Sequence, residues 1–220
     1  MIPFVVFDLD DTLYKEIDYV HSGHNYISHI FSQKYGLNKD LCVKILREAT
    51  NPFEGLSKYM SEFGGTEDVQ WMIEAYRSHF PNIELSHETK NILNQLLEER
   101  ISMAIITDGR YISQWNKIKA LGLDNYINKS NIIISEVIGC DKHHANGFQL
   151  IMRQNPNCSK FFYIGDNTSK DFYWPNKLGW TTICLKDNGK NIHQQNFDIE
   201  FEYKPQHIIH NFSDIIPLIL

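Results

Sequence analysis

Short apolar runs recur along the chain and predict buried β-strands. Runs of this length that stay apolar throughout are typical of strands covered on both faces, as in a parallel sheet. Between most of the runs, apolar residues recur at helical spacing, as at Ile112, Trp115 and Ile118. Alternation of such strands and helices predicts an α/β fold with a Rossmann-like parallel sheet. The runs cover residues 2–7, 101–107, 131–134, 160–164 and 180–185.

One long interval interrupts this alternation, because no strand pattern occurs between the first and second runs. Turn-forming residues divide the interval into helical stretches. Ser86 is a candidate N-cap for the last stretch, which we assign to the sheet domain as the crossover into the second strand. We therefore predict a core domain of residues 1–14 plus 83–220 and an inserted all-helical domain of residues 15–82. The predicted helices cover about 16–35, 38–49, 53–63, 66–79 and 87–99.

The composition is that of a globular protein and argues against several function classes. Of 220 residues, 42% are hydrophobic and 22% are charged, and 21 basic against 27 acidic residues give a formal net charge of −6. This acidic balance argues against nucleic-acid or anionic-membrane binding, but it allows a small anionic substrate. No apolar run approaches the roughly 18 residues of a membrane helix, and the N-terminus lacks the basic region of a signal peptide. We expect a cytoplasmic protein.

The polar stretch 187–198 predicts a long surface loop, the least structured part of the chain.

Paired carboxylates follow the first predicted strand. The run ends in F-D-L-D-D-T-L-Y, which places Asp8, Asp10 and Thr12 just beyond it, and ligands of an open parallel sheet bind outside the carboxyl ends of the strands. Alternation along the strand brings Asp8 and Asp10 toward one face, where two carboxylates repel unless a cation lies between them. Mg²⁺, which takes oxygen ligands, suits such a place. Taken alone, the segment also fits an ordinary turn, because Asp and Thr are common turn formers.

The other strand ends carry polar residues of matching chemistry. Thr107 ends the second run in T-D-G-R, where its hydroxyl and the free amides before a helix suit a phosphate oxygen. Lys142 follows the third run, and Asp166 follows the fourth with Asp171 five residues on. Each signal is weak alone, because helix caps and surface charges are common at such places. Together the strand ends carry D-x-D-x-T, Thr, Lys and G-D-x4-D in that order.

In content and order these segments resemble the four motifs of the haloacid dehalogenase (HAD) superfamily. The resemblance covers the sheet domain from Met1 to about Leu185 and includes K-L-G-W-T-T-I-C-L at 177–185. The helical insertion resembles the cap of the first class of that superfamily (C1), which closes over the site, excludes water and contacts the substrate. One departure follows Lys142, because relatives usually have a proline soon after this lysine and this chain reads K-H-H-A-N-G-F.

The resemblance implies phosphoryl transfer through the paired aspartates, with Mg²⁺ as cofactor. Asp8 would attack phosphorus and become an aspartyl phosphate. Asp10 would act as general acid toward the leaving alkoxide and then as general base for the hydrolytic water. The metal ligands would be Asp8, Asp166 and the backbone carbonyl of Asp10. The halide-releasing branch of the superfamily lacks the second aspartate and magnesium, so D-x-D favours phosphoryl transfer. It does not separate a phosphatase from a phosphomutase.

Further residues receive supporting roles by the same resemblance. Thr107, Asp108 and nearby amides would hold phosphate oxygens, and Lys142 would offset the charge shared by phosphate and nucleophile. Asp171 would orient a metal-bound water or Lys142, and Thr12 would hydrogen-bond to Asp10. The candidate substrate contacts lie next to the motifs: Tyr14, Lys15 and Arg110.

The leading hypothesis is a Mg²⁺-dependent phosphatase that hydrolyses a small phosphomonoester. One alternative is a phosphomutase on the same scaffold, similar to β-phosphoglucomutase, which would return the phosphoryl group to its substrate. Another is a non-catalytic metabolite-binding protein that keeps the fold. The expected partner is a small phosphorylated metabolite rather than a nucleic acid or a membrane, and the chain is expected to be a monomer or a homodimer.

Overall fold

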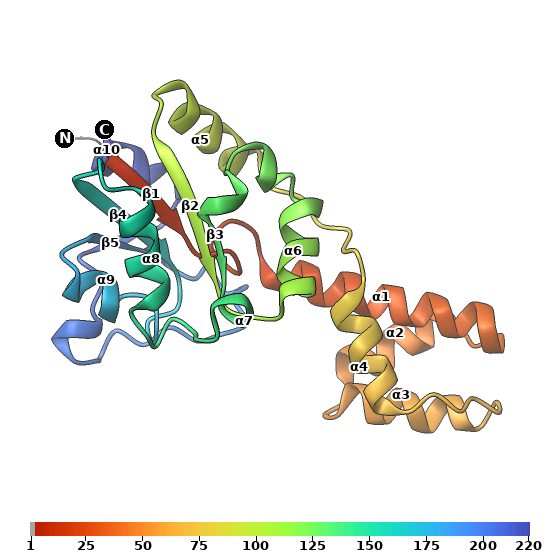
Figure 1. The fold of residues 1–220 in the computed structure, drawn as a ribbon. Helices are drawn as coiled ribbons and strands as arrows, with labels where there is room; N and C mark the ends of the chain where they lie inside the picture. Colours follow the sequence, from red (N-terminus) through yellow and green to blue (C-terminus); the bar gives the residue numbers. More distant parts are fainter. Residues whose placement is uncertain (1–2) are drawn as a thin grey trace. The chain divides into compact units, whose positions relative to one another are not determined.

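A six-stranded parallel sheet organises the first of two compact units. The computed structural model describes residues 3–220, and its strands pair in the order β3-β2-β1-β4-β5-β6, each pairing parallel (Figure 1). All five predicted strands are present, and the predicted α/β class is confirmed. The sixth strand was not predicted from the sequence, because it is short and only Ile209 of its three residues is buried. The strands are β1 (Pro3–Phe7), β2 (Ser102–Thr107), β3 (Ile132–Ile134), β4 (Lys160–Gly165), β5 (Thr181–Leu185) and β6 (His207–Ile209).

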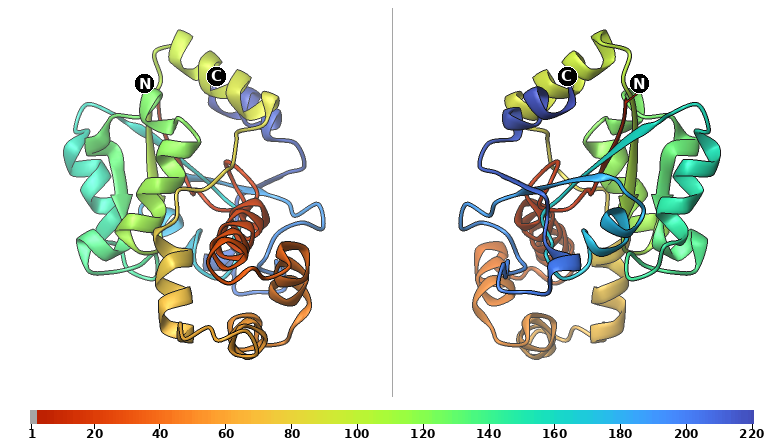
Figure 2. Two further views of the ribbon diagram at one scale, coloured as in Figure 1. Left: turned by 90° about the vertical axis from the view of Figure 1, so that its right-hand side faces the viewer. Right: turned by 90° about the vertical axis from the view of Figure 1, so that its left-hand side faces the viewer.

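Helices connect these strands. Ser86 caps α5 (His87–Glu98) as predicted, since its Oγ accepts a hydrogen bond of 3.0 Å from the amide of Thr89. The C-terminal 3₁₀ turn η4 (Phe212–Ile215) lies beside α5, where the amide of Ser213 donates to Glu88 at 2.9 Å (Figure 2). Other helices of this unit are α6 (Tyr111–Ala120), α7 (Ser135–Ile138), α8 (Asn146–Gln154), α9 (Tyr173–Lys177) and α10 (Ile216–Ile219).

The apolar strand residues build a core on the sheet. Val6, Ile106 and Tyr163 belong to one buried cluster together with Phe148 of α8. The ring of Trp180 stacks on that of Phe161 with 4.9 Å between ring centroids. Burial of these side chains provides the main favourable free energy of folding. It also fixes β2, β1 and β4 next to one another, so that their carboxyl ends form one edge.

The second unit is helical and has a core of its own. Contacts divide the chain into a unit containing the residues up to Ile17 with Glu84–Leu220, and a unit of Asp18–Ile83. Asn38 caps α2 through the amide of Leu41 at 3.0 Å, and Asp68 caps α4 through that of Trp71 at 2.7 Å. Apolar side chains of all four helices form the core, including Phe31, Leu46, Leu56 and Met72. The helices are α1 (Glu16–Tyr35), α2 (Lys39–Glu48), α3 (Pro52–Ser61) and α4 (Val69–Ser78).

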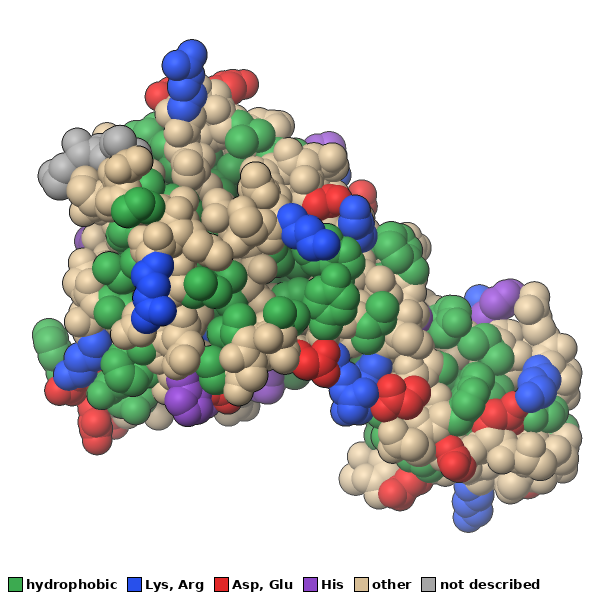
Figure 3. Space-filling model, viewed as in Figure 1, with side chains coloured by type: hydrophobic (Ala, Val, Ile, Leu, Met, Phe, Trp, Pro, Cys, Tyr) green, Lys and Arg blue, Asp and Glu red, His purple; other side chains and the backbone are tan. Residues whose placement is uncertain are grey.

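The charged side chains are dispersed over the face seen in Figure 3. Lysines and arginines alternate there with acidic residues, and neither sign gathers into one patch. In the described part of the chain, no helix has the length and apolarity needed to span a membrane.

Candidate active site

The predicted motif residues converge on the carboxyl edge of the sheet. Strands β1 and β4 are neighbours in the sheet, and the order of strands along the chain reverses between them. A crevice at such a reversal is the usual ligand site of an open α/β sheet. The amide of Asp8 still donates to the carbonyl of Ile164 at 2.8 Å, which ties the first loop to the end of β4. A cavity of about 100 Å³ opens at this edge. It is lined by Asp8, Asp10, Asp11, Glu16, Thr107, Asp108, Asp166, Asn167, Lys170 and His193.

Lys142 lies at the centre of the buried charges. Its Nζ is 2.7 Å from Asp8 Oδ1, 2.6 Å from Asp171 Oδ1 and 3.2 Å from the hydroxyl of Tyr163. Burial alone would lower the pKa of Lys142, but the charges of Asp171 and Asp8 keep that pKa well above its ordinary value. The lysine is therefore cationic and touches the predicted nucleophile, even though no proline follows it in the sequence.

Three carboxylates face this single lysine. Side-chain oxygens of Asp8, Asp166 and Asp171 lie within 4.8 Å of one another, and all three residues are buried. Burial, with the negative charges of Asp171 and Asp8, raises the pKa of Asp166 to about 9. Burial raises the pKa of Asp8 to about 7 against the opposing charge of Lys142. The cluster thus has too little positive charge, and its hard oxygen donors fit a divalent cation such as Mg²⁺.

Asp10 has a different environment although it lies two residues from Asp8. Its Oδ1 accepts hydrogen bonds from the Tyr14 hydroxyl at 2.5 Å and from Lys117 Nζ at 2.8 Å. Its Oδ2 accepts hydrogen bonds from Lys117 Nζ at 3.0 Å and from Gln114 Nε2 at 3.1 Å. Burial alone would raise the pKa of Asp10, but the charge of Lys117 and these hydrogen bonds hold it below its ordinary value. Asp10 is therefore an ionised carboxylate with protein donors on both oxygens.

The rest of the first loop is held by other contacts. The Thr12 hydroxyl donates to Asp166 Oδ1 at 3.4 Å, whereas we predicted a bond to Asp10. The difference arises because Asp10 turns toward α6 and leaves Thr12 facing the end of β4. Asp11 has a φ of 57°, a left-handed conformation that is uncommon for residues other than glycine. Its two oxygens accept the amides of Glu16 at 3.0 Å and Ile192 at 2.9 Å.

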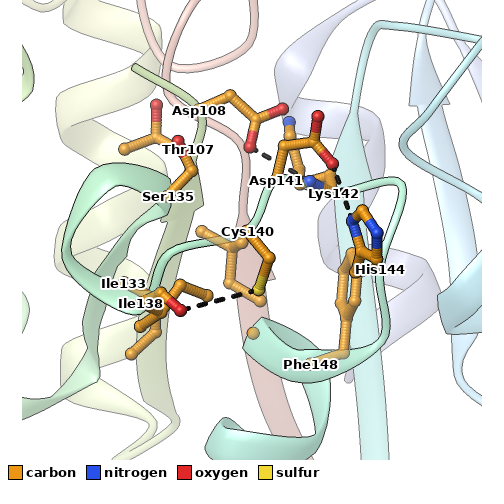
Figure 4. A pocket seen from close by; sticks show the side chains of 12 residues that line it. Thr107, Asp108, Ile133, Ser135, Ile138, Cys140, Asp141, Lys142, His144 and Phe148 are labelled. Carbon is orange, nitrogen blue, oxygen red and sulfur yellow. Dashed lines mark hydrogen bonds and ion pairs between the residues drawn. The ribbon is translucent and has the colours of Figure 1, made fainter. Parts of the chain in front are cut away.

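The second and third loops meet at Asp108. Its Oδ1 accepts the backbone amide of Lys142 at 3.1 Å, and its Oδ2 accepts Lys170 Nζ at 2.8 Å. Figure 4 shows the carboxylate of Asp108 directed at the backbone of Lys142 in the neighbouring loop, near Thr107 at the end of β2. Gly109 has a φ of 146°, and a Cβ there would lie 2.5 Å from Gln114 Nε2, so the turn requires glycine. Thr107 is buried and lines the cavity.

The three candidate substrate contacts are absent from the lining of the acidic cavity. Tyr14 is 6% exposed and donates to Asp10. Lys15 Nζ donates to Asn191 Oδ1 at 2.6 Å, and Lys15 and Tyr14 line a separate cavity. Arg110 stands at the N-cap of α6 and lines a shallow depression beside α7. Position next to a motif in the sequence was therefore a poor guide to position in the cavity.

The polar segment 187–198 contributes more than the sequence suggested. It contains no helix or strand, as predicted, but it is anchored to the site. Asn191 Nδ2 donates to Asp166 Oδ2 at 2.9 Å, and Gln195 Nε2 donates to the carbonyl of Asp166 at 2.8 Å. His193 lines the cavity itself. The carboxamide of Asn191 thus holds one of the candidate metal ligands.

Comparison with known proteins agrees with the motif order. Residues 5–184 match the family model described as haloacid dehalogenase-like hydrolase. A glyceraldehyde 3-phosphate phosphatase of Methanocaldococcus jannaschii is 26% identical over 212 residues, which cover 90% of this chain and 91% of the relative. The enzyme of the same name from Pyrococcus furiosus is 25% identical, over 92% of this chain and 86% of its own length.

Solved structures show the same fold. A HAD phosphatase from Thermococcus onnurineus has a TM-score of 0.61 at 18% identity and covers 99% of this chain and 97% of its own. A 2-haloacid dehalogenase from Pseudomonas syringae has a TM-score of 0.64 at 19% identity, covering 100% and 98% of the two chains. Because a phosphatase and a dehalogenase match equally well, the chemistry has to be argued from the site residues.

Proposed function

We propose, because the chain belongs to the haloacid dehalogenase-like hydrolase family, that it is a Mg²⁺-dependent phosphatase acting on a small phosphomonoester. The observation that carries this proposal is the different environment of two neighbouring aspartates. Asp8 contacts Lys142 in the acidic cluster, and Asp10 is held apart by Lys117. A halide-releasing relative needs only the first of these. The second carboxylate, that of Asp10, is held by contacts of its own. Such a group favours phosphoryl transfer, in which it donates a proton to the leaving group and then accepts one from water.

The proposed reaction has two steps. Asp10, ionised in the resting site, first takes up a proton from the monoanionic phosphate ester. An oxygen of Asp8 attacks phosphorus, the bond from phosphorus to the ester oxygen breaks, and Asp10 gives that proton to the departing alkoxide. Water then attacks the phosphorus of the aspartyl phosphate, Asp10 takes a proton from it, and the bond from phosphorus to Asp8 breaks. The products are an alcohol and inorganic phosphate.

The other residues hold charge during these steps. Lys142 offsets the negative charge shared by Asp8 and the phosphoryl group, and Thr107 with the amide of Asp108 holds non-bridging oxygens. Asp8, Asp166 and the backbone carbonyl of Asp10 are the proposed ligands of Mg²⁺. The bound ion supplies Lewis-acid stabilisation of phosphoryl oxygens. The shortage of positive charge around Asp166 supports this assignment.

The relatives suggest where to look for the substrate. Four curated relatives are named glyceraldehyde 3-phosphate phosphatase, at 24–26% identity. We therefore propose a substrate of this class, a short phosphorylated aldehyde or alcohol.

The test is phosphate release from glyceraldehyde 3-phosphate, glycerol phosphates, sugar phosphates, phosphoglycolate and nucleotides, with Mg²⁺ and with a chelator. We expect Mg²⁺-dependent release of one phosphate per alcohol formed, highest on three-carbon esters. Isomer accumulation without free phosphate would instead identify a phosphomutase. Absence of turnover on every ester, together with retained binding of one of them, would identify a metabolite-binding protein.

A further inference from the structure

The side chain of Lys117 is buried beside the proposed general acid. Lys117 is 3% exposed, lies on α6 after the second strand, and reaches back to both oxygens of Asp10. Lysine is rarely buried to this degree unless it is paired, because removing an ammonium group from water costs several kcal/mol. A helix residue 107 positions from Asp10 in the chain thus carries a specific charge contact at the site.

Gln114 completes the contact from one turn earlier on α6. Its Nε2 donates to Asp10 Oδ2 at 3.1 Å and to the carbonyl of Asp108 at 2.7 Å. Residues three apart on a helix lie on one face, so α6 presents Gln114 and Lys117 together. The Tyr14 hydroxyl approaches from the first loop. We call these three side chains the Asp10 clamp.

Asp10 needs such support because its own segment provides little. It lies past the end of β1 in a turn whose next residue, Asp11, has a φ of 57°. Proton transfer to a leaving oxygen requires hydrogen-bond distance and alignment, and a displacement of 1 Å at a reacting group costs on the order of 10² in rate. A carboxylate with donors on both oxygens is fixed in position and in plane.

We propose that Lys117, supported by Gln114, is a positioning residue that holds Asp10 where it gives and takes the proton. This inference rests on the proposed phosphatase function. Lys117 itself does not line the acidic cavity, so it acts through Asp10. Asp8 and its Lys142 contact belong to a separate set of charges.

The test is Lys117→Met, which keeps the length of the side chain and removes its charge. With glycerol 3-phosphate or glyceraldehyde 3-phosphate, we expect kcat to fall about 10²-fold and KM to change less than about 3-fold, the loss that misplacing a reacting group produces. With p-nitrophenyl phosphate, whose leaving group needs no proton, we expect the burst of p-nitrophenol in the first turnover to keep its rate within about 3-fold. A purely structural defect would slow both esters equally.

A double-mutant cycle separates positioning from general damage. If Lys117 acts through Asp10, adding Lys117→Met to Asp10→Asn costs less than about 3-fold further, because the group it positions is already gone. A further loss of about 10² in that background would overturn the proposal. The matched control is Lys119→Met on the same helix, where Lys119 is half-exposed and pairs with Asp124 at 2.6 Å. We expect that variant to behave as the wild type.

Two milder variants keep the test decisive if Lys117→Met does not fold. Gln114→Leu and Tyr14→Phe each remove one donor, and we expect each to show the same dependence on the leaving group with a smaller loss. Equal losses on both esters in these variants would overturn the proposal. A wild-type protein that hydrolyses none of the esters would refute the phosphatase function and the positioning role with it, whereas an active wild type with unaffected variants would refute only the positioning role.

Discussion

The two units bury polar groups in opposite ways. Between Asp18 and Ile83, the buried polar side chains of the structure are His24, Ser28 and His79, none of them carboxylates or lysines. Burial lowers the pKa of His24 to about 4, so this unit keeps its interior neutral at pH 7. The sheet unit instead places ion pairs of buried lysines beside its cavity, Lys117 with Asp10 and Lys142 with Asp171. Buried charge is costly for a fold, and its concentration around one cavity of the sheet unit indicates where chemistry takes place.

Within the sheet unit, the charges are again of two kinds. Asp10, whose side chain is partly exposed, has its charge compensated by the buried Lys117. In the group of Asp8, Asp166 and Asp171, the direct lysine contacts within residues 3–220 are those of Lys142, at 2.7 Å from Asp8 and 2.6 Å from Asp171. A site that must bind a divalent cation has to keep such a deficit, because a second lysine would repel the ion. The two kinds of carboxylate therefore respond differently to substitution and to metal.

The largest effect is expected for Asp8→Asn. Loss of the proposed nucleophile removes covalent catalysis, so kcat should fall at least about 10⁴-fold, equivalent to about 5.5 kcal/mol. Folding should be maintained, because Lys142 keeps Asp171 as a partner at 2.6 Å. Phosphate release and circular dichroism check both parts. Asp40→Asn, on the exposed surface of α2, is the matched control. Unchanged turnover in Asp8→Asn would show that Asp8 is not the nucleophile and does not differ in role from the other carboxylates.

Next in size is the loss of the shared cation. Lys142→Met leaves Asp8 and Asp171 buried without a positive partner, and breaking a buried pair on one side typically costs about 3–5 kcal/mol. We expect the free energy of unfolding in urea to fall by that amount. Lys170→Met is the comparison variant, because Lys170 is partly exposed where it meets Asp108 and should cost less than about 1 kcal/mol. Equal losses of unfolding free energy in the two variants would show that the burial of Lys142 does not raise the cost of removing its charge.

Metal binding should distinguish the two kinds of carboxylate directly. At a Mg²⁺ concentration of about 100 times Kd, linkage adds about 2.7 kcal/mol to the free energy of unfolding of the wild type. Asp166→Asn should abolish that gain. Asp10→Asn should retain it, since only the backbone carbonyl of Asp10 is a proposed ligand and its side chain pairs with Lys117. Thermal unfolding with Mg²⁺ and with a chelator measures the gain. Loss of this Mg²⁺-dependent gain in Asp10→Asn would mean that the Asp10 side chain also takes part in metal binding, and that the two carboxylate environments are not separate.

The sequence indicated the strand ends well and the supporting contacts poorly. Asp8 and Asp166 were identifiable because each directly follows a buried strand, and Lys142 because it lies in the loop region after β3. Parallel strands bring such ends together. Lys117 had no such signal, since a lysine in the last turn of a helix is usually a solvated charge. Its burial depends on how α6 packs beside the first loop, which is a property of the folded chain.

The same reasoning explains the remaining differences. Asn191 lies in a polar stretch with the composition of a surface loop, and only the fold brings it within 2.9 Å of Asp166. Thr12 was assigned to Asp10 from proximity in the sequence, whereas the side chain of Asp10 turns toward α6. The helix positions were better predicted, because apolar periodicity and caps such as Ser86 are local signals.

The smallest predicted effect concerns the neutral interior of the helical unit. His24 has a pKa of about 4 when folded and an ordinary value of 6.5 when unfolded, so the unfolded state binds a proton first as the pH falls. The contribution of neutral His24 to the free energy of unfolding is therefore fully present above about pH 6.5 and is lost progressively toward pH 4. Between pH 8 and pH 5 we expect the opening free energy of α1, measured by amide hydrogen exchange, to fall by about 2 kcal/mol. His24→Leu should remove this pH dependence, and His29→Gln, at an exposed position of the same helix, should keep it. A wild-type helix with no such dependence would mean that His24 is not held neutral by burial, and the contrast between the two interiors would then be one of composition alone.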